Sequence, residues 1–284
     1  MNANKFRNSG CDVPLAFAVG KEAARTARAG LQPRNRILAA LPREILSSLL
    51  PHLKPEFLPR SKVLYDVDEP LGHVYFVERG LVSMVAVFEN RTTAEMATVG
   101  REGLVGIGSV LGGERALGRY VVPVPALALA VEASEFRSAL RQSPELRAAC
   151  RNYAHAFLGE ALQTAACNSV HVVEERCARW LLMSYDRSDG DTLALTQEYL
   201  ADMLGVCRST VTLAAGALQR AGLICYRRGA ISVLNRPGLE KASCECYRVI
   251  RNQYERLLPR TDEQQLSQRK LSLAEEPYLA QGVG

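Results

Sequence analysis

The sequence lacks the features of a membrane or secreted protein. Its longest run without a charged or strongly polar side chain is residues 121–131, which include two prolines, whereas a membrane-spanning helix needs about 20 apolar residues. The apolar stretch 14–20 resembles a signal-peptide core only faintly, because Asp12 precedes it and Lys21 follows it. We therefore expect a cytoplasmic protein that makes no membrane contact.

Motifs of the common enzyme classes are also missing. The sequence contains no G-x-S-x-G, H-E-x-x-H or Walker lysine motif. Residues 100–108 (GREGLVGIG) are rich in glycine, but they lack the order G-x-G-x-x-G and lie between expected strands instead of before a helix. We expect no enzymatic activity.

The eight cysteines include no C-x-x-C pair. Without a secretion signal, we expect reduced thiols, most of them small core residues. Cys244 and Cys246 form a C-x-C pair, but no histidine lies near it in the sequence, and a zinc site needs four ligands. We therefore expect no metal site and no resident cofactor.

What the sequence does contain is a globular chain of about two domains. Its length of 284 residues exceeds that of one domain of about 100–200 residues. Its contents of hydrophobic residues, 48%, and of charged residues, 23%, are close to the average of globular proteins. Residues 1–34 and 259–284 show no clear periodicity, which indicates a flexible arm and tail. Residues 37–58 predict short helices interrupted by prolines.

The region between residues 60 and 131 has the pattern of a β-domain. Short runs rich in β-branched and aromatic residues alternate with turn residues such as Arg79-Gly80. The predicted strands are residues 63–65, 73–78, 81–88, 92–99, 120–122 and 126–131. Many short strands without long helices between them predict an antiparallel sandwich or barrel.

A long helix follows the β-domain. Ser143-Pro144 predicts its start and the apolar pattern extends it to about residue 168. It has two apolar faces, one with Tyr153, Phe157 and Ala161 and one with Leu158 and Leu162. We expect the first face to pair with a second copy of the chain and the other to lie on the β-domain. The alternative is a helix fully buried within one monomer.

Residues 195–236 predict a winged helix-turn-helix. Its parts are a helix capped by Thr196, a turn at Gly205, a second helix from about Arg208 to Gly222, and a hairpin within residues 223–233. The segment 205–236 holds five arginines and no Asp or Glu, which favours a nucleic acid as the partner.

The second helix of this unit has an exposed start that can enter a major groove. We expect base contacts from Arg208, Ser209 and Thr212, because a guanidinium group matches guanine O6 and N7. The expected phosphate contacts are Thr196, Gln197, Thr210, Arg227 and Arg228. The alternative function is a ligand-binding signalling protein whose C-terminal domain contacts another protein instead of DNA.

This unit resembles the winged helix-turn-helix of the Crp/Fnr family of bacterial transcription regulators. The matching residues are Leu204-Gly205-Val206, Arg208-x-Thr210-Val211, Gly222-Leu223-Ile224 and Arg228-Gly229. Upstream, Glu69-Pro70, Val74-Tyr75-Phe76-Val77, Gly80 and Val82-Ser83 resemble the family's cyclic-nucleotide-binding β-roll. The similarity extends over about residues 37–250.

The resemblance implies an α+β fold in which an N-terminal double-stranded β-helix (β-roll or jelly-roll) senses an effector. The expected parts are an arm at 1–34, the β-roll at 35–137, a dimerisation helix at 138–170, the DNA-binding domain at 171–258 and a tail at 259–284. It also implies a homodimer that binds an inverted-repeat operator in double-stranded DNA and contacts RNA polymerase.

The sequence departs from the family where a cyclic nucleotide would bind. Family members that bind one have a Gly-Glu pair followed by Arg-Ser or Arg-Thr, but residues 100–119 contain neither of these last pairs, and the expected arginine falls on Ala116. The candidates for the effector pocket are Glu102, Arg115 and Arg119, and the two arginines leave an anionic effector open. We expect that the effector is not cyclic AMP. An Fnr-type iron–sulfur cluster needs several N-terminal cysteines, and Cys11 stands alone.

Overall fold

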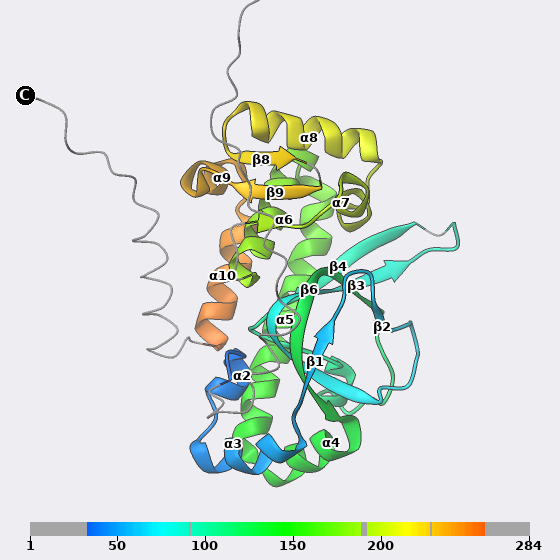
Figure 1. Cartoon of the computed structure of the whole chain (residues 1–284), viewed down its shortest axis with the longest axis vertical. Helices are drawn as coiled ribbons and strands as arrows, with labels where there is room; N and C mark the ends of the chain where they lie inside the picture. The colour runs from blue at the N-terminus through cyan, green and yellow to red at the C-terminus, as the bar shows by residue number, and fades with distance from the viewer. Residues whose placement is uncertain (1–32, 91, 189–191, 228, 259–284) are drawn as a thin grey trace, which may run out of the picture.

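The structure is a computed structural model that describes residues 33–90, 92–188, 192–227 and 229–258. Its elements, labelled in Figure 1, are α2 (Arg36–Ala39), α3 (Arg43–Leu49), η1 (Leu50–His52), β1 (Lys54–Leu58), β2 (Val63–Tyr65), β3 (His73–Val87), β4 (Thr93–Val99), β5 (Leu104–Val105), η2 (Ile107–Ser109), β6 (Arg119–Glu132), α4 (Ala133–Gln142), α5 (Pro144–Val170), α6 (Val173–Arg187), β7 (Thr192–Leu193), α7 (Gln197–Leu204), α8 (Arg208–Arg220), β8 (Ile224–Arg227), β9 (Ala230–Val233), α9 (Arg236–Ala242) and α10 (Cys246–Leu257).

These elements form the predicted α+β fold, with an antiparallel sheet, flanking helices and a C-terminal helix-turn-helix. Apart from residues 33 and 34, the predicted arm lies outside the described residues, as does the predicted tail. Among the helices described, none has the length and apolar character needed to cross a lipid bilayer.

The predicted helical region 37–58 is confirmed only as far as residue 52. Residues 54–58 form β1 and pair with β6, from Lys54 opposite Ala130 to Leu58 opposite Ala126. Prolines interrupt the helical pattern, and the backbone hydrogen bonds of a neighbouring strand outweigh the weak local preference of such a short segment.

The centre of the larger sheet consists of two long strands, β3 and β6, where the sequence pattern predicts two short strands each. The sheet order is β1-β6-β3-β4, with β2 paired to β6 and β5 to β3. The β3–β6 register shifts on both sides of Arg79 and again after Leu81. Gly80 adopts φ 80° and lies so close to Pro125 and Ala126 that a Cβ atom would clash. The turn residues that predict a break between residues 78 and 81 therefore correspond to an irregularity within one long strand, β3.

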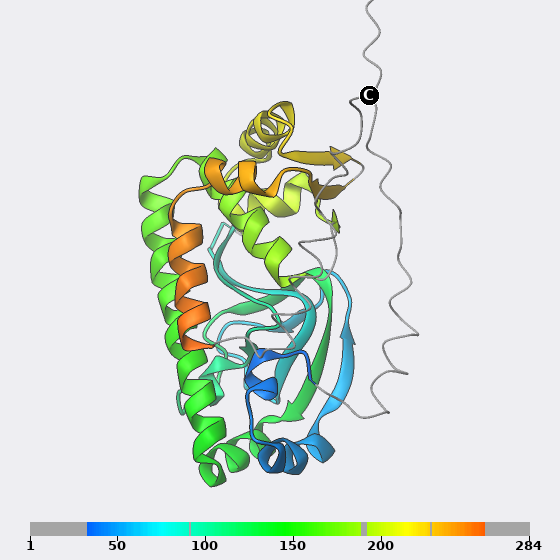
Figure 2. The same cartoon turned by 90° about the vertical axis from the view of Figure 1, so that its left-hand side faces the viewer.

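Helix α5 runs along the side of the sheet for the length of the molecule, and α10 lies beside it (Figure 2). Its start is the predicted one, because the Ser143 side chain accepts a hydrogen bond from Leu146 N at 3.1 Å. Its inner face packs against the β-domain, where Tyr153 Oη donates to Leu104 O at 3.1 Å. Figure 2 shows that the opposite face of α5 has no neighbouring element among those described.

A buried ion network joins the β-domain to the helices of the C-terminal half. Arg187 of α6 lies 2.7 Å from Glu102, in the turn before β5, and 2.7 Å from Glu160 of α5. Its side chain is 7% exposed, and those of Glu102 and Glu160 are 6% and 1% exposed. Because buried charges need partners, these ion pairs hold α5, α6 and the turn before β5 together.

A second buried carboxylate connects β4 to α6. Glu95 accepts hydrogen bonds from Ser83 Oγ and from Trp180 Nε1, both at 2.5 Å. Desolvation raises the pKa of Glu95 above its ordinary value, although both hydrogen bonds act in the opposite direction. The β-domain therefore contacts the C-terminal half through specific polar groups.

Candidate DNA-binding surface and sensor interior

The predicted helix-turn-helix is present as α7 and α8. Thr196 caps α7 by accepting a hydrogen bond from Tyr199 N at 3.2 Å. Gly205 ends α7 with φ 63°, a left-handed conformation that glycine adopts without strain. Helix α8 buries Val211 and Leu218 against the rest of the domain. The local signals in the sequence were sufficient to place both helices and the turn.

Helix α8 presents an exposed face at one end of the molecule. Arg208, Ser209 and Thr212 are all exposed on it, in the places where base contacts are predicted. Thr212 Oγ1 lies 2.9 Å from Gln197 Oε1, which links this face to the first turn of α7. The same face carries Leu213, which is 68% exposed. Leu213 is a candidate for apolar contact with a thymine methyl group.

Leu213 is not among the contacts predicted from the sequence, which are all polar side chains. The available signal was its position outside the buried stripe of α8, which contains Val211, Ala215 and Leu218. A large apolar residue on a helix face that has no intramolecular partner is a candidate for contact with another molecule.

Cys207, the residue before α8, forms hydrogen bonds with two of the predicted contact residues. Cys207 Sγ lies 3.1 Å from Ser209 Oγ and 3.0 Å from Thr210 Oγ1. The hydroxyl groups of Ser209 and Thr210 lower the pKa of this exposed thiol to about 7. Both hydroxyl groups therefore already have an intramolecular partner at the place where contact with DNA is predicted.

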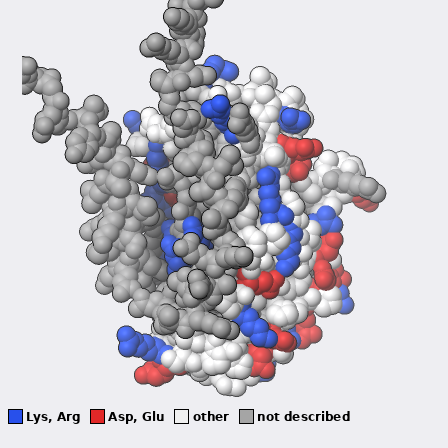
Figure 3. Space-filling view, viewed as in Figure 1, with Lys and Arg blue, Asp and Glu red and all other residues white. Residues whose placement is uncertain are grey.

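Four of the five predicted phosphate contacts lie within the described residues. Thr196 and Arg227 are exposed, whereas Gln197 and Thr210 are half-buried, and Arg228 lies outside the described residues. Figure 3 shows mainly basic side chains at the end of the molecule that carries α8, and mixed charges over the sensor half. Arg236, the fifth arginine of the acid-free segment, is instead half-buried and pairs with Asp186 at 2.7 Å.

The three effector candidates take part in three separate ion pairs. Glu102 belongs to the buried network with Arg187. Arg119 Nη2 pairs with Asp66 Oδ2 at 2.7 Å and Arg115 Nη1 with Asp68 Oδ2 at 3.4 Å. The effector pocket stays a prediction, and an anionic effector would have to compete with these carboxylates for both arginines.

The predicted dimer contacts of α5 are wrong for its two aromatic residues. Tyr153 is 0% exposed and Phe157 is 5% exposed in a single chain. Their rings lie 5.7 Å apart, and Tyr153 packs closely against Gly103. Both aromatic side chains fill the space between α5 and the sheet, while Ala161 is half-buried. The alternative of a helix fully buried in one monomer is also wrong, because Leu158 and Leu162 are 58% and 64% exposed.

Comparison with known proteins agrees with the two-part organisation. Residues 55–143 match the model of the cyclic nucleotide-binding domain, and residues 175–242 match the Crp-like helix-turn-helix domain. Two global nitrogen regulators are similar. The Synechocystis protein is 25% identical over 71% of this chain and 93% of its own length, and the Synechococcus elongatus protein 27% identical over 68% and 90%.

Solved structures share the fold. FixK2 from Bradyrhizobium japonicum has a TM-score of 0.59 at 19% identity, over 68% of this chain and 98% of that chain. A Crp/Fnr-family regulator from Thermus thermophilus has a TM-score of 0.55 at 23% identity, over 67% and 98%. Proteins with this organisation are transcription factors and not enzymes. With an effector-binding domain of the cyclic nucleotide-binding type followed by a Crp-like helix-turn-helix domain, the chain belongs to the Crp/Fnr family of transcription regulators.

Proposed function

We propose that the protein is a homodimer that binds an inverted-repeat operator through α8 and responds to an effector other than cyclic AMP. The observation that carries this proposal is the exposed face of α8, with Arg208, Ser209 and Thr212 on it, in a segment that has no acidic residue from 205 to 236. An acid-free recognition helix next to a basic hairpin favours a polyanionic groove over a protein surface.

The proposed contacts divide into two classes. Arg208, Ser209 and Thr212 read bases, and Leu213 adds an apolar contact. Thr196, Gln197, Thr210, Arg227 and Arg228 contact phosphates and set the orientation of the domain. We propose RNA polymerase as a protein partner, because the resemblance to the Crp/Fnr family implies that contact.

The direct test is selection of bound sequences from a random DNA library with the full chain, followed by a mobility-shift titration. We expect an inverted repeat with half-sites about 34 Å apart, because a twofold dimer places its recognition helices one turn of DNA apart. A protein partner instead of DNA would favour the signalling alternative. Selection of a single, asymmetric half-site would contradict the dimeric arrangement.

We expect Arg208→Ala and Arg227→Ala to weaken DNA binding in different ways. Loss of a bidentate arginine–guanine contact costs about 1–3 kcal/mol, or about 5- to 150-fold in affinity, at one base pair. Arg208→Ala should therefore lose preference at that pair, whereas Arg227→Ala should weaken all sequences alike and lower the salt slope by about one charge. Titrations at several salt concentrations distinguish the two. Full operator preference in Arg208→Ala would show that the base assignment is wrong.

A second copy of the chain is the proposed partner of the outer face of α5. His155, Leu158, Leu162, Ala165 and Ser169, here called the outer stripe, are exposed at three- and four-residue spacing. The small residues at 165 and 169 let a second helix approach closely. Helix α5 has 27 residues and is about 40 Å long, which is sufficient for a twin helix to pack along the stripe.

We expect no micromolar binding of cyclic AMP by calorimetry on nucleotide-free protein. Arg115 and Arg119 are paired with Asp68 and Asp66, and a buried cyclic phosphate without an arginine lacks a charge-assisted hydrogen bond. Operator DNA titrated into the same sample serves as the activity control. Micromolar binding that tightens operator affinity would overturn this part of the proposal.

A further inference from the structure

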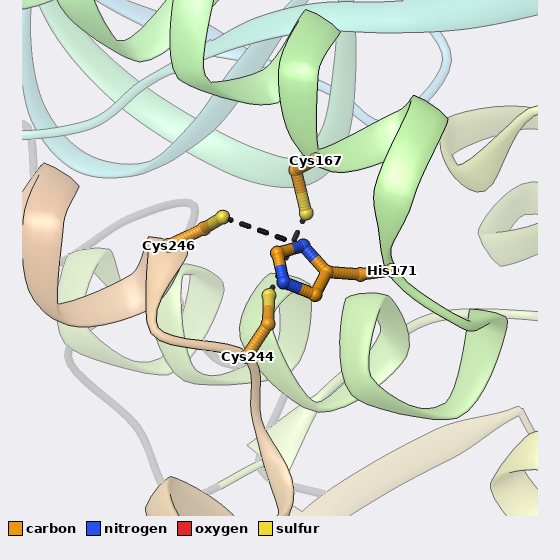
Figure 4. Close-up of side chains that lie close together, drawn as sticks. All are labelled: Cys167, His171, Cys244 and Cys246. Atoms are coloured by element: carbon orange, nitrogen blue, oxygen red, sulfur yellow. Dashed lines mark hydrogen bonds between the residues drawn. The ribbon is translucent and has the colours of Figure 1, made fainter.

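Four side chains with metal-binding groups meet where α5 ends and α10 begins. They are Cys167, His171, Cys244 and Cys246 (Figure 4). One ligand atom from each lies within 4.8 Å of the others. Cys167 Sγ lies 3.5 Å from Cys244 Sγ, and Cys246 Sγ lies 3.6 Å from His171 Nδ1.

The two pair distances of 3.5 and 3.6 Å are close to the edges of a tetrahedral site for one metal ion. Bonds of about 2.3 Å to sulfur and about 2.0–2.1 Å to nitrogen place two sulfurs about 3.8 Å apart, and a sulfur and a nitrogen about 3.6 Å apart. An iron–sulfur cluster has a core of several atoms, so its ligands must surround a larger volume than these four atoms enclose. The spacing therefore favours a mononuclear site.

The surroundings of the histidine support this interpretation. His171 Nδ1 faces the sulfurs, while Nε2 lies 3.2 Å from Glu245 Oε2. A carboxylate on the second ring nitrogen orients a metal-bound imidazole and increases its basicity. Gln163 Nε2 donates to Cys246 Sγ at 3.1 Å, a hydrogen bond that favours a thiolate.

The charges around the four side chains also support a metal site. Arg176 and Arg179, on the adjacent α6, are 8% and 4% exposed, and their Nε atoms have no hydrogen-bond partner among the described residues. Arg179 Nη1 lies 3.5 Å from Thr164 Oγ1, three residues before Cys167 on α5. Three thiolates and a divalent ion carry one net negative charge, which nearby guanidinium groups stabilise.

Ordinary packing explains the cluster less well. Buried cysteines often act as small apolar core residues, but Cys167, Cys244 and Cys246 form a cluster of their own, separate from the main hydrophobic core. We propose that Cys167, His171, Cys244 and Cys246 bind one thiophilic divalent metal ion of the Zn²⁺ class. Because the protein supplies all four ligands, the site is closed and structural.

The ion would connect segments that are remote in sequence. Cys167 and Cys244 are 77 residues apart. His171 lies just before α6, and Cys244 lies in the link between α9 and α10. Bound metal would therefore hold the last helices of the DNA-binding domain against the end of α5, and its binding free energy would add to the stability of the folded chain.

Cobalt titration of the reduced, chelator-treated full chain tests the proposal. We expect one equivalent of Co²⁺ to produce the visible bands of a tetrahedral site and a sulfur-to-cobalt charge-transfer band, and Zn²⁺ to bleach both. Native mass spectrometry should show one Zn²⁺ per chain. Glu245→Gln, which keeps all four ligands, should weaken Zn²⁺ binding about 10- to 100-fold.

The double variant Cys167→Ser/Cys244→Ser should lose the cobalt bands, and Zn²⁺ should no longer raise its melting temperature. Cys207→Ser, which removes an exposed thiol elsewhere in the chain, should bind like the wild type. Absence of metal binding by the reduced wild type, cobalt bands that persist in the double variant, or bands lost in Cys207→Ser would each refute the proposal. Iron accompanied by acid-labile sulfide, or a Cys167–Cys244 disulfide that persists under reduction in place of metal, would also overturn it.

Discussion

Replacing Leu158 with glutamate is expected to convert the protein into a monomer and to weaken operator binding at least about 100-fold, because each half-site is then bound without its linked partner. Leu158 is 58% exposed in the single chain, so the substitution leaves the interior of the monomer intact. In the proposed dimer, the new carboxylate would be desolvated without a partner, which is costly. Leu162→Glu, one turn further along the outer stripe, should have the same effect.

Sedimentation and mobility-shift titration measure both consequences. Leu117→Glu is a matched control, because Leu117 is also 58% exposed but lies outside α5; it should remain dimeric and bind the operator normally. Phe157→Glu should differ from both, since Phe157 is 5% exposed inside the chain and a charge there should destabilise folding. An intact dimer in Leu158→Glu at all accessible concentrations would show that the outer stripe is not the interface.

Replacing Arg187 with methionine is expected to destabilise the chain by about 3–5 kcal/mol, the cost of breaking a buried ion pair by removing one partner. Glu102 and Glu160 would remain buried without their cation. Because Glu102 belongs to the sensor half and Arg187 to α6, the variant should also loosen the junction between sensor and DNA-binding domain.

Urea unfolding at neutral pH measures this effect. Arg115→Met removes an arginine that is 58% exposed and paired with Asp68, and it should change stability by less than about 1 kcal/mol. Adding Glu102→Gln and Glu160→Gln to Arg187→Met should recover part of the loss, since no unpaired charge then remains buried. A loss below about 1 kcal/mol in Arg187→Met would mean that water reaches the network and screens it.

Local signals predicted the helix-turn-helix correctly. Three features define it: the cap at Thr196, the left-handed Gly205 and the apolar spacing of α8. Each depends only on residues close together in the sequence, so each can be recognised from the sequence alone. The breaks predicted within β3 and β6 correspond to irregular pairing at positions such as Gly80. A bulge and a turn have the same local sequence signature, and only the partner strand distinguishes them.

The sequence by itself determined the α+β class, the order of the two domains and the start of α5, because these depend on periodicity and on caps. Tertiary structure decided which apolar stripe of α5 faces the sheet, because the helical periodicity of apolar residues identifies two faces but not the surface that covers each of them. It also decided that Asp66 and Asp68 pair with Arg119 and Arg115, and that Cys167 and Cys244 lie 3.5 Å apart across 77 residues. Such contacts depend on how distant segments pack together, which no pattern of neighbouring residues encodes.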